Sequence, residues 1–258
     1  MSSTTAERTL YQFPISHYCE KTRWHLDAKG LSYSVHNLLP GLHRKVTQRV
    51  AGITTVPLLM DRGTPVGDSS QIALHLERSY PDSPSLLPAS GPERERILEL
   101  EEFFDDAGGI HVRRWIYGQL LEGSVLASIM FPPGPGRLFG RVMLPVIKSK
   151  LRQLYAIRPD TVEESRRRLL EGLDRIEREI DGDPSRYLVG NTLSLADITA
   201  AALYGPLVAP DNSPWKERPG VAYPSAATEL RAQVRARPAG QWVLRRYEQD
   251  RRRTAQAS

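Results

Sequence analysis

Residues 9–37 predict a strand, a tight turn, a helix and a second strand, and this unit constrains the fold more than any other stretch. Residues 9–13 are rich in β-branched and aromatic side chains, and Pro14 ends this strand because proline donates no ladder hydrogen bond. Helical spacing follows from His17 until Gly30 provides a stop, and residues 31–37 are strand-like again. The order is that of a βαβ unit.

Ser16 stands where the helix of this unit begins. The first N–H groups of a helix lack partners and its dipole is positive there, so a thiolate at this end is stabilised. The turn reads Ser16-His17-Tyr18-Cys19, whereas thioredoxin-like proteins carry Cys-x-x-Cys in this place. Ser16 cannot form a disulfide, but its hydroxyl can donate a hydrogen bond to the thiolate of a ligand. An ordinary N-cap is the alternative, since serine fills that role well.

The next residues extend this unit into a thioredoxin-like domain. A short amphipathic segment at residues 43–50 precedes two strands, the first over residues 54–60. A helix capped by Asp68 and Ser69 then runs to Tyr80 with apolar residues at helical spacing. The order β-α-β, short helix, β-β-α is that of a thioredoxin-like fold.

The predicted fold class is an α/β thioredoxin-like N-terminal domain followed by an all-α C-terminal domain. The first domain is expected over residues 8–82, and the second over residues 93–250. Prolines and serines break the periodicity between them, so residues 83–92 are predicted to be a linker.

The helical half has three notable features. Its long first helix is expected to bend at Gly108-Gly109. An insert rich in proline and glycine at residues 131–139 suggests a lid or a dimer contact. Ser194 and Asp197 are spaced for a capping box that starts a buried helix.

Composition favours a cytoplasmic protein. One cysteine among 258 residues excludes an intrachain disulfide and a thiolate metal cluster, which fits a reducing compartment. Residues 1–8 are polar and lack the apolar segment of a secretory signal. No stretch is long enough to span a bilayer, so no membrane contact is expected.

The formal net charge of +5 is concentrated near the C-terminus. The arginines gathered there are Arg245, Arg246, Arg251, Arg252 and Arg253. Because no recognition motif accompanies them, we expect a solvated, frayed tail and no nucleic-acid partner.

Three motifs in sequence resemble the cytosolic glutathione transferases over about residues 9–247. They are Ser16-x-x-Cys19-x-x-x-Arg23, Val56-Pro57 followed by Asp68-Ser69, and Gly190-x-x-Leu193-Ser194-x-x-Asp197. Each is weak alone, but this order before an all-helical half is similar to the serine-type classes, such as theta and zeta. The resemblance implies a glutathione transferase that activates the thiol of glutathione for attack on a small electrophile. It also implies glutathione as co-substrate, no metal, and a homodimer.

Residue by residue, the resemblance makes Ser16 the catalytic hydroxyl that stabilises the thiolate of glutathione. It implies that the Val56 backbone pairs with the cysteinyl part of glutathione and that Pro57 is cis. Ser69, at a helix start, is implied to hold the γ-glutamyl carboxylate, and Asp68 the ammonium. A helix cap is the alternative for this last pair.

Other positions depart from the family pattern or carry no assigned role. His17 stands where proline is common, Cys19 is expected to pack inward, and Arg23 is interpreted as structural. The candidates for the glycyl carboxylate are His43, Arg44 and Lys45. The candidates for the wall of the second-substrate site are Tyr18, His111, Trp115, Tyr117 and the insert at residues 131–139.

Two other functions stay open at this point. The chain could keep the fold as a non-catalytic binding or assembly module. Alternatively, it could be a glutathione-dependent thiol–disulfide oxidoreductase like the omega-like classes, although those use a leading cysteine.

Overall fold

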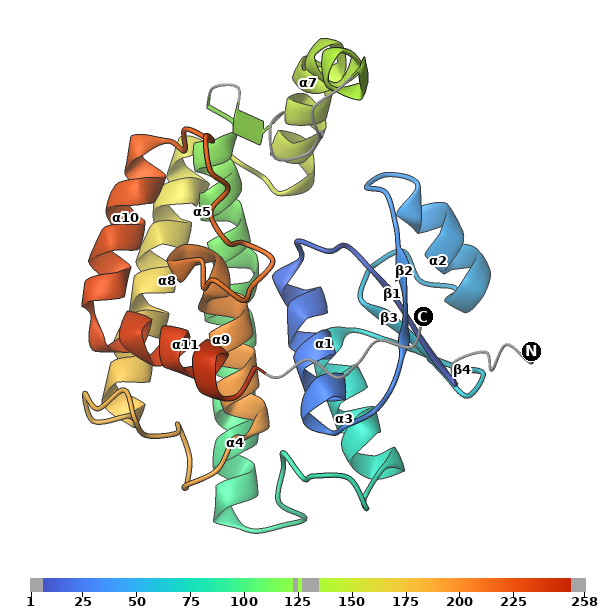
Figure 1. Cartoon of the computed structure of the whole chain (residues 1–258), viewed down its shortest axis with the longest axis vertical. Coiled ribbons are helices and arrows are strands. Elements are labelled where there is room, and N and C mark those ends of the chain that lie inside the picture. The colour runs from blue at the N-terminus through green and yellow to red at the C-terminus, as the bar shows by residue number, and fades with distance from the viewer. Residues whose placement is uncertain (1–6, 123–124, 127–134, 252–258) are drawn as a thin grey trace.

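A four-stranded sheet in the order β2-β1-β3-β4 forms the first part of the computed structural model (Figure 1). The structure describes residues 7–122, 125–126 and 135–251. The elements of this part are β1 (Arg8–Gln12), α1 (His17–Ala28), β2 (Ser34–Asn37), α2 (His43–Ala51), β3 (Leu58–Asp61), β4 (Thr64–Gly67) and α3 (Ser69–Ser79).

The strand pairing confirms the predicted thioredoxin-like domain. β1 runs parallel to β2, with Leu10 opposite Val35, and antiparallel to β3, with Leu10 opposite Leu59. α1 makes the crossover between the parallel pair, as a βαβ connection requires. Leu10 and Leu59 are fully buried and pack with Leu26 of α1 and Leu76 of α3. β3 begins later than predicted, at Leu58, directly after the cis Val56–Pro57 bond.

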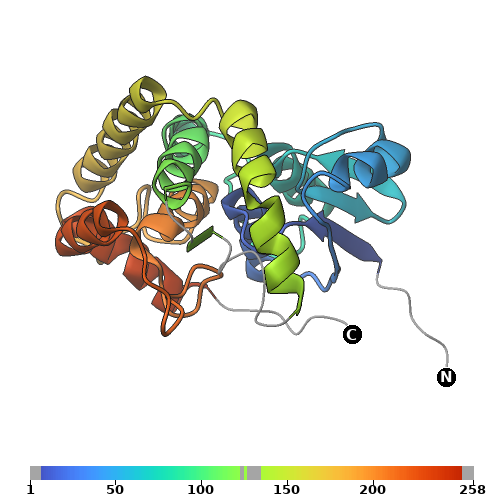
Figure 2. The same cartoon turned by 90° about the horizontal axis from the view of Figure 1, so that it is seen from above.

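Every element described after α3 is helical, which confirms the predicted all-α second domain. These elements are α4 (Pro92–Phe104), η1 (Asp105–Ile110), α5 (His111–Leu120), α7 (Pro135–Leu154), α8 (Pro159–Glu179), α9 (Leu195–Val208), α10 (Ser225–Ala236) and α11 (Pro238–Gln249). α7 stands above the other helices and the sheet in Figure 1, and in the view from above it crosses over the region between them (Figure 2). Of the insert, residues 131–134 lie outside the described residues, and residues 135–139 begin α7. Within the described ranges, none of the helices could cross a membrane by its length and apolar character.

α9 is the buried centre of the helical part and packs against α1, α4 and α11. Its predicted capping box is confirmed: Ser194 Oγ accepts from the Asp197 N–H at 3.4 Å, and Asp197 Oδ2 accepts from the Ser194 N–H at 2.9 Å. Asp197 Oδ1 also accepts from the Leu188 N–H at 2.8 Å. One carboxylate therefore ties the start of α9 to the preceding loop.

The bend expected at Gly108-Gly109 is a π-helical segment, η1, between α4 and α5. A Cβ atom on Gly108 would lie 2.7 Å from the Tyr204 ring, and one on Gly109 would lie 2.0 Å from the Tyr18 hydroxyl. Two glycines therefore let η1 approach α9 on one side and the start of α1 on the other.

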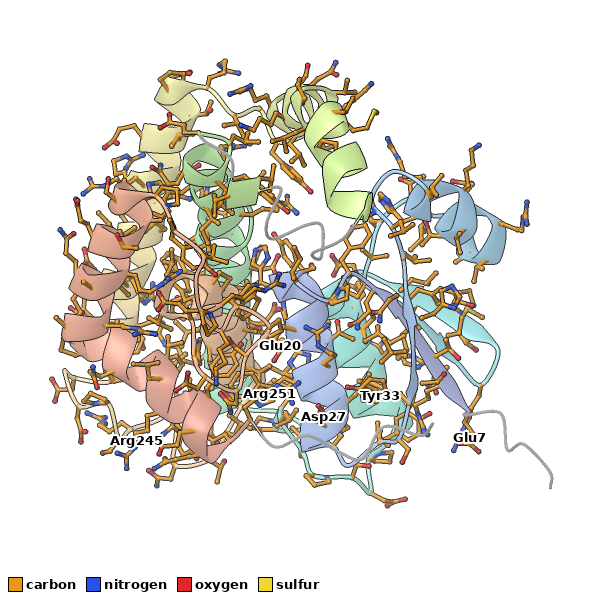
Figure 3. The ribbon with its side chains drawn as sticks, turned by 45° about the horizontal axis from the view of Figure 1, so that its top comes forward. Glu7, Glu20, Asp27, Tyr33, Arg245 and Arg251 are labelled. Atoms are coloured by element: carbon orange, nitrogen blue, oxygen red, sulfur yellow. The ribbon has the colours of Figure 1, made fainter. Side chains whose placement is uncertain are left out.

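The prediction of a solvated, frayed basic tail is wrong for Arg246 and Arg251, which are buried. Arg251 Nε donates to Glu20 Oε1 at 2.7 Å, and its Nη1 donates to Asp27 Oδ2 at 2.6 Å (Figure 3). Buried carboxylates on α1 require a counter-charge, and the end of the chain supplies one. Arg245 is exposed as predicted. Residues 252–253 lie outside the described residues.

Candidate functional site

Ser16 is the N-cap of α1, as its position in the turn predicts. Its backbone is extended, its N–H donates to Phe13 O at 3.1 Å, and its C=O accepts from the Glu20 N–H at 2.9 Å. Its Oγ accepts from the Cys19 N–H at 3.4 Å. Because this cap uses the hydroxyl oxygen as an acceptor, the hydroxyl proton is left for a further hydrogen bond. The cap and a donor role toward a ligand are therefore compatible.

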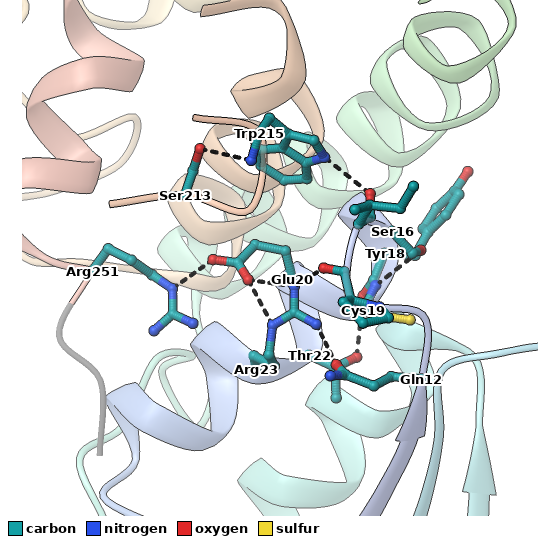
Figure 4. Close-up of polar contacts among 12 residues, drawn as sticks. Gln12, Ser16, Tyr18, Cys19, Glu20, Thr22, Arg23, Ser213, Trp215 and Arg251 are labelled. Atoms are coloured by element: carbon teal, nitrogen blue, oxygen red, sulfur yellow. Dashed lines mark hydrogen bonds and ion pairs between the residues drawn. The ribbon is translucent and has the colours of Figure 1, made fainter. Parts of the chain in front are cut away.

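The helical domain holds the Ser16 turn from both sides. Trp215 Nε1 donates to Ile15 O at 2.9 Å (Figure 4). His17 Nε2 lies 2.8 Å from Gly109 O in η1, and because a carbonyl only accepts, Nε2 carries the proton. Burial, together with the nearby charge of Arg113, lowers the pKa of His17 to about 3. A neutral His17 is therefore an N–H donor at neutral pH, a role that the sequence did not suggest.

The two remaining polar positions of this motif are structural. Cys19 is a buried free cysteine, which confirms that it packs inward, and burial raises the pKa of its thiol. Arg23 donates to Glu20 Oε2 at 2.7 Å, to Pro14 O at 3.1 Å and to Gln12 Oε1 (Figure 4). These contacts join the end of β1 to α1 and confirm the structural interpretation of Arg23.

The Val56–Pro57 peptide bond is cis, as the family resemblance implied. Val56 is half-buried, and the ladder between β1 and β3 begins only at Leu58. The Val56 backbone thus lies just before β3, the strand next to the one that leads to Ser16. Because Val56 lies outside the ladder, an extended peptide could pair with its backbone there.

Asp68 is the N-cap of α3, so the helix cap considered as the alternative to ligand binding is present in the structure. Its Oδ1 accepts from the Ser70 N–H at 3.0 Å and from the Gln71 N–H at 3.1 Å. Its backbone has φ 65°, a region that costs a residue other than glycine about 1–3 kcal/mol. Ser69, the first residue of the helix, is 2% exposed.

An acidic cavity of about 510 Å³ lies between the start of α3 and the helical domain. Its lining includes Tyr18, Ser70, Gln71, Glu101, Glu102, Asp105 and Asp106. Tyr18, a predicted wall residue of the second-substrate site, lines it, whereas none of the residues predicted to bind glutathione does; Ser70 is the neighbour of Ser69. The carboxylates come from α4 and η1, and no local pattern in the sequence connects them with α3.

A buried lysine neutralises part of this acidic wall. Lys21 Nζ lies 2.5 Å from Glu101 Oε1, 2.8 Å from Asp105 Oδ1 and 2.9 Å from Ser70 Oγ. Burial raises the pKa of Asp105, while the Lys21 charge acts to lower it. The described part of the chain brings together no group of three residues suited to a metal ion.

The predicted wall of a second-substrate site is wrong at Trp115, which is 5% exposed and belongs to the core. His111 Nδ1 lies 3.1 Å from Ser165 Oγ of α8, which ties it to the bundle. Tyr117 stacks on Tyr155, with ring centroids 5.2 Å apart.

The candidates for the glycyl carboxylate lie at the start of α2. The His43 ring is 4.8 Å from the Phe13 ring, so this helix starts beside the end of β1. His43 Nδ1 accepts from the Gly41 N–H at 3.1 Å, whereas Arg44 and Lys45 are exposed.

Two family models match the chain. The glutathione S-transferase N-terminal domain matches residues 10–84, and the glutathione S-transferase C-terminal domain matches residues 159–228. No curated protein is significantly similar in sequence.

Solved structures share the fold at low sequence identity. One is the beta-etherase LigF from Sphingobium sp. strain SYK-6, with 21% identity and a TM-score of 0.59 over 93% of this chain and 99% of that one. A serine-to-cysteine mutant of poplar glutathione transferase F1 has 14% identity and a TM-score of 0.63 over 94% and 92% of the two chains. A glutathione S-transferase from Methylobacterium radiotolerans, in complex with glutathione sulfonate, has 22% identity and a TM-score of 0.56 over 90% and 92%.

Proposed function

The chain belongs to the cytosolic glutathione transferase superfamily, and from this premise we propose that it transfers glutathione to small electrophiles. In this proposal Ser16 donates a hydrogen bond to the thiolate of bound glutathione. The thiolate then attacks the electrophile, forming a carbon–sulfur bond as the leaving group departs.

The geometry of the Ser16 turn is the observation that carries this proposal. The Ser16 oxygen accepts from the Cys19 N–H, and this contact does not use the hydroxyl proton, which Ser16 would donate to the ligand. The positive end of the α1 dipole adds to the stabilisation of an anion there. Trp215 and His17 fix the backbone on either side of Ser16, which preorganises the donor before the ligand arrives.

The remaining site residues suggest how glutathione lies. The Val56 backbone is available to the cysteinyl part, beside the cis Pro57. We propose that the γ-glutamyl carboxylate binds at the start of α3, where Ser69 and the helix dipole favour an anion. Its ammonium would then point toward Asp68 and the acidic cavity. Glutathione in the M. radiotolerans neighbour, bound as its sulfonate, supports a site of this kind.

A thiol–disulfide oxidoreductase receives less support. Such an enzyme needs an accessible thiol with a lowered pKa. Cys19 is buried, its pKa is raised, and the leading position of the turn is Ser16.

A non-catalytic binding module is separated from an enzyme by two measurements on the same protein. Calorimetry measures glutathione binding, and absorbance follows conjugation of glutathione to chlorodinitrobenzene. A transferase gives both signals. Binding without conjugation across several electrophile classes supports the module, and the absence of binding removes the glutathione site altogether. We further propose a homodimer, which light scattering on the purified chain tests directly.

A further inference from the structure

We propose that the second substrate is an aromatic electrophile with an anionic group, and that Arg113 of α5 binds this group. This inference rests on the transferase function proposed above. It adds the chemical class of the substrate and a residue that recognises it.

Arg113 lies between two tyrosine rings. Its guanidinium carbon is 4.5 Å from the centroid of the Tyr155 ring and 5.6 Å from the centroid of the Tyr18 ring. Its Nε is buried and has no hydrogen-bond partner among the described residues. The neighbouring Arg114 differs, because it donates to Tyr155 O at 2.8 Å and to Ser165 Oγ at 3.2 Å.

An unsatisfied guanidinium of this kind is suited to an anionic ligand. The faces of the tyrosine rings attract the cation, but they leave the N–H groups at the edge of the Arg113 fork without acceptors. A carboxylate or a sulfonate accepts from two such N–H groups at once. An anion at the Arg113 fork would supply the acceptor that this guanidinium lacks among the described residues.

Arg113 lies near the turn at which the thiolate of glutathione would react. Tyr18, which contacts the guanidinium, is only two residues after Ser16, and His17 between them is bonded to η1 just before α5. An anionic group on Arg113 thus lies on the helical-domain side of the Ser16 turn.

The surrounding rings suit an aromatic substrate. Tyr117 lies one helical turn after Arg113 on α5, and its ring stacks on Tyr155 with an angle of 21° between the planes. Tyr155 already carries Tyr117 and Arg113 against it, so Tyr18, on the other side of the cation, is the ring on which a flat substrate can stack while its anionic group meets Arg113.

The test compares chlorodinitrobenzene with its carboxylated analogue, chlorodinitrobenzoate, each corrected for its uncatalysed rate with glutathione. The variants are Arg113→Met, which removes the charge, and Arg113→Lys, which keeps it. Arg245→Met, at an exposed site, is the control for the change of net charge. We expect Arg113→Met to lower kcat/KM for the carboxylated substrate about ten- to a hundredfold, mainly through a higher KM. For the neutral substrate, kcat/KM should change by less than about threefold. Arg113→Lys should recover part of the loss.

An equal loss for both substrates, or no loss for the carboxylate, overturns the inference. If the parent protein conjugates neither substrate, the proposed function fails first, and binding decides about Arg113 separately. Calorimetry then compares unreactive nitrobenzoate with nitrobenzamide. A preference for the anion that Arg113→Met abolishes supports the inference, whereas equal binding of the two compounds rejects it.

Discussion

Arg251 Nε donates to Glu20 Oε1 at 2.7 Å although 231 positions separate the two residues in the chain. Both side chains are 2% exposed, and Arg251 also donates to Asp27 Oδ2. Burial alone would raise the pKa of Glu20, but the charges of Arg251 and Arg23 lower it. Arg251, the last described residue, thus keeps Glu20 ionised and paired within α1, the helix that Ser16 caps.

Arg251→Met should therefore destabilise the whole protein. Removing one partner of a buried ion pair costs about 3–5 kcal/mol, because the other charge is left without compensation. Unfolding in urea measures the change. Arg245→Met is the matched control, since Arg245 is exposed, and we expect it to change stability little. Equal stability of the two variants would show that Arg251 is not needed by α1.

Local patterns in the sequence were enough for much of the fold. The βαβ unit, the Ser16 cap and the Ser194–Asp197 box each depend on residues a few positions apart, where spacing and capping chemistry act directly. The cis Pro57 came from the family resemblance and is confirmed. The domain bounds at residues 8–82, 83–92 and 93–250 remain a proposal.

The features that the sequence did not predict are pairings between distant segments. Arg251 with Glu20, His17 with Gly109, and Lys21 with Glu101 all join α1 to helices of the second domain or to the C-terminal end. Each residue alone looks like an ordinary charged or polar side chain. Only the packing of the domains shows which of them are buried and which need a partner.

Asp197→Ala should destabilise the protein and leave the glutathione site intact. Loss of a cap costs about 0.5–2 kcal/mol, and more is expected here because the carboxylate also accepts from Leu188 inside the core. The expected result is a lower Tm with a nearly unchanged KM for glutathione. Asp160→Ala, in the exposed first turn of α8, should leave the Tm almost unchanged. A variant as stable as the parent would contradict the capping role.

Stability should fall as the pH falls below about 6.5, because His17 and His25 are buried in neutral form. Burial lowers the pKa of His17 to about 3, and it lowers that of His25 well below 6.5, with Lys21 and Lys29 adding to the effect. The unfolded chain thus binds protons that the folded chain does not. This contribution is complete above pH 6.5 and is lost toward pH 3, with a slope of at most about 1.4 kcal/mol per pH unit for each histidine.

Asp197 opposes this trend, because burial raises its pKa to about 6. Its contribution to the free energy of unfolding is complete below pH 3.8 and is lost as the pH rises through 6. Urea unfolding at about pH 7.5 and pH 5 measures the net effect. His25→Leu should reduce the loss of stability on acidification, since neither ring nitrogen of His25 has a partner among the described residues. An identical pH dependence in the variant would contradict this assignment.

Ser16→Ala should lower the rate of conjugation by about one to three orders of magnitude, the range for losing one donor to a developing anion. Glutathione affinity should change little, because the γ-glutamyl contacts remain. The pKa of the bound thiol, read from thiolate absorbance against pH, should rise. Thr161→Ala, at the start of α8, is the control for a lost cap. Weaker binding with an unchanged rate would contradict the donor role.

Asp68 and Ser69 provide the sharpest separation of a ligand site from a helix cap. If Ser69 holds the γ-glutamyl carboxylate, Ser69→Ala removes a hydrogen bond to a charged group, worth about 1.5–3 kcal/mol, so glutathione should bind roughly ten- to a hundredfold more weakly. Asp68→Asn keeps an acceptor for the Ser70 and Gln71 N–H groups but removes the counter-charge of the ammonium, so it should weaken binding with a small change in Tm. Ser79→Ala, at the exposed end of the same helix, is the control. Calorimetric titration read beside melting curves decides the matter: lower stability with unchanged affinity in both variants would make these residues caps alone and would remove the glutathione site proposed at α3.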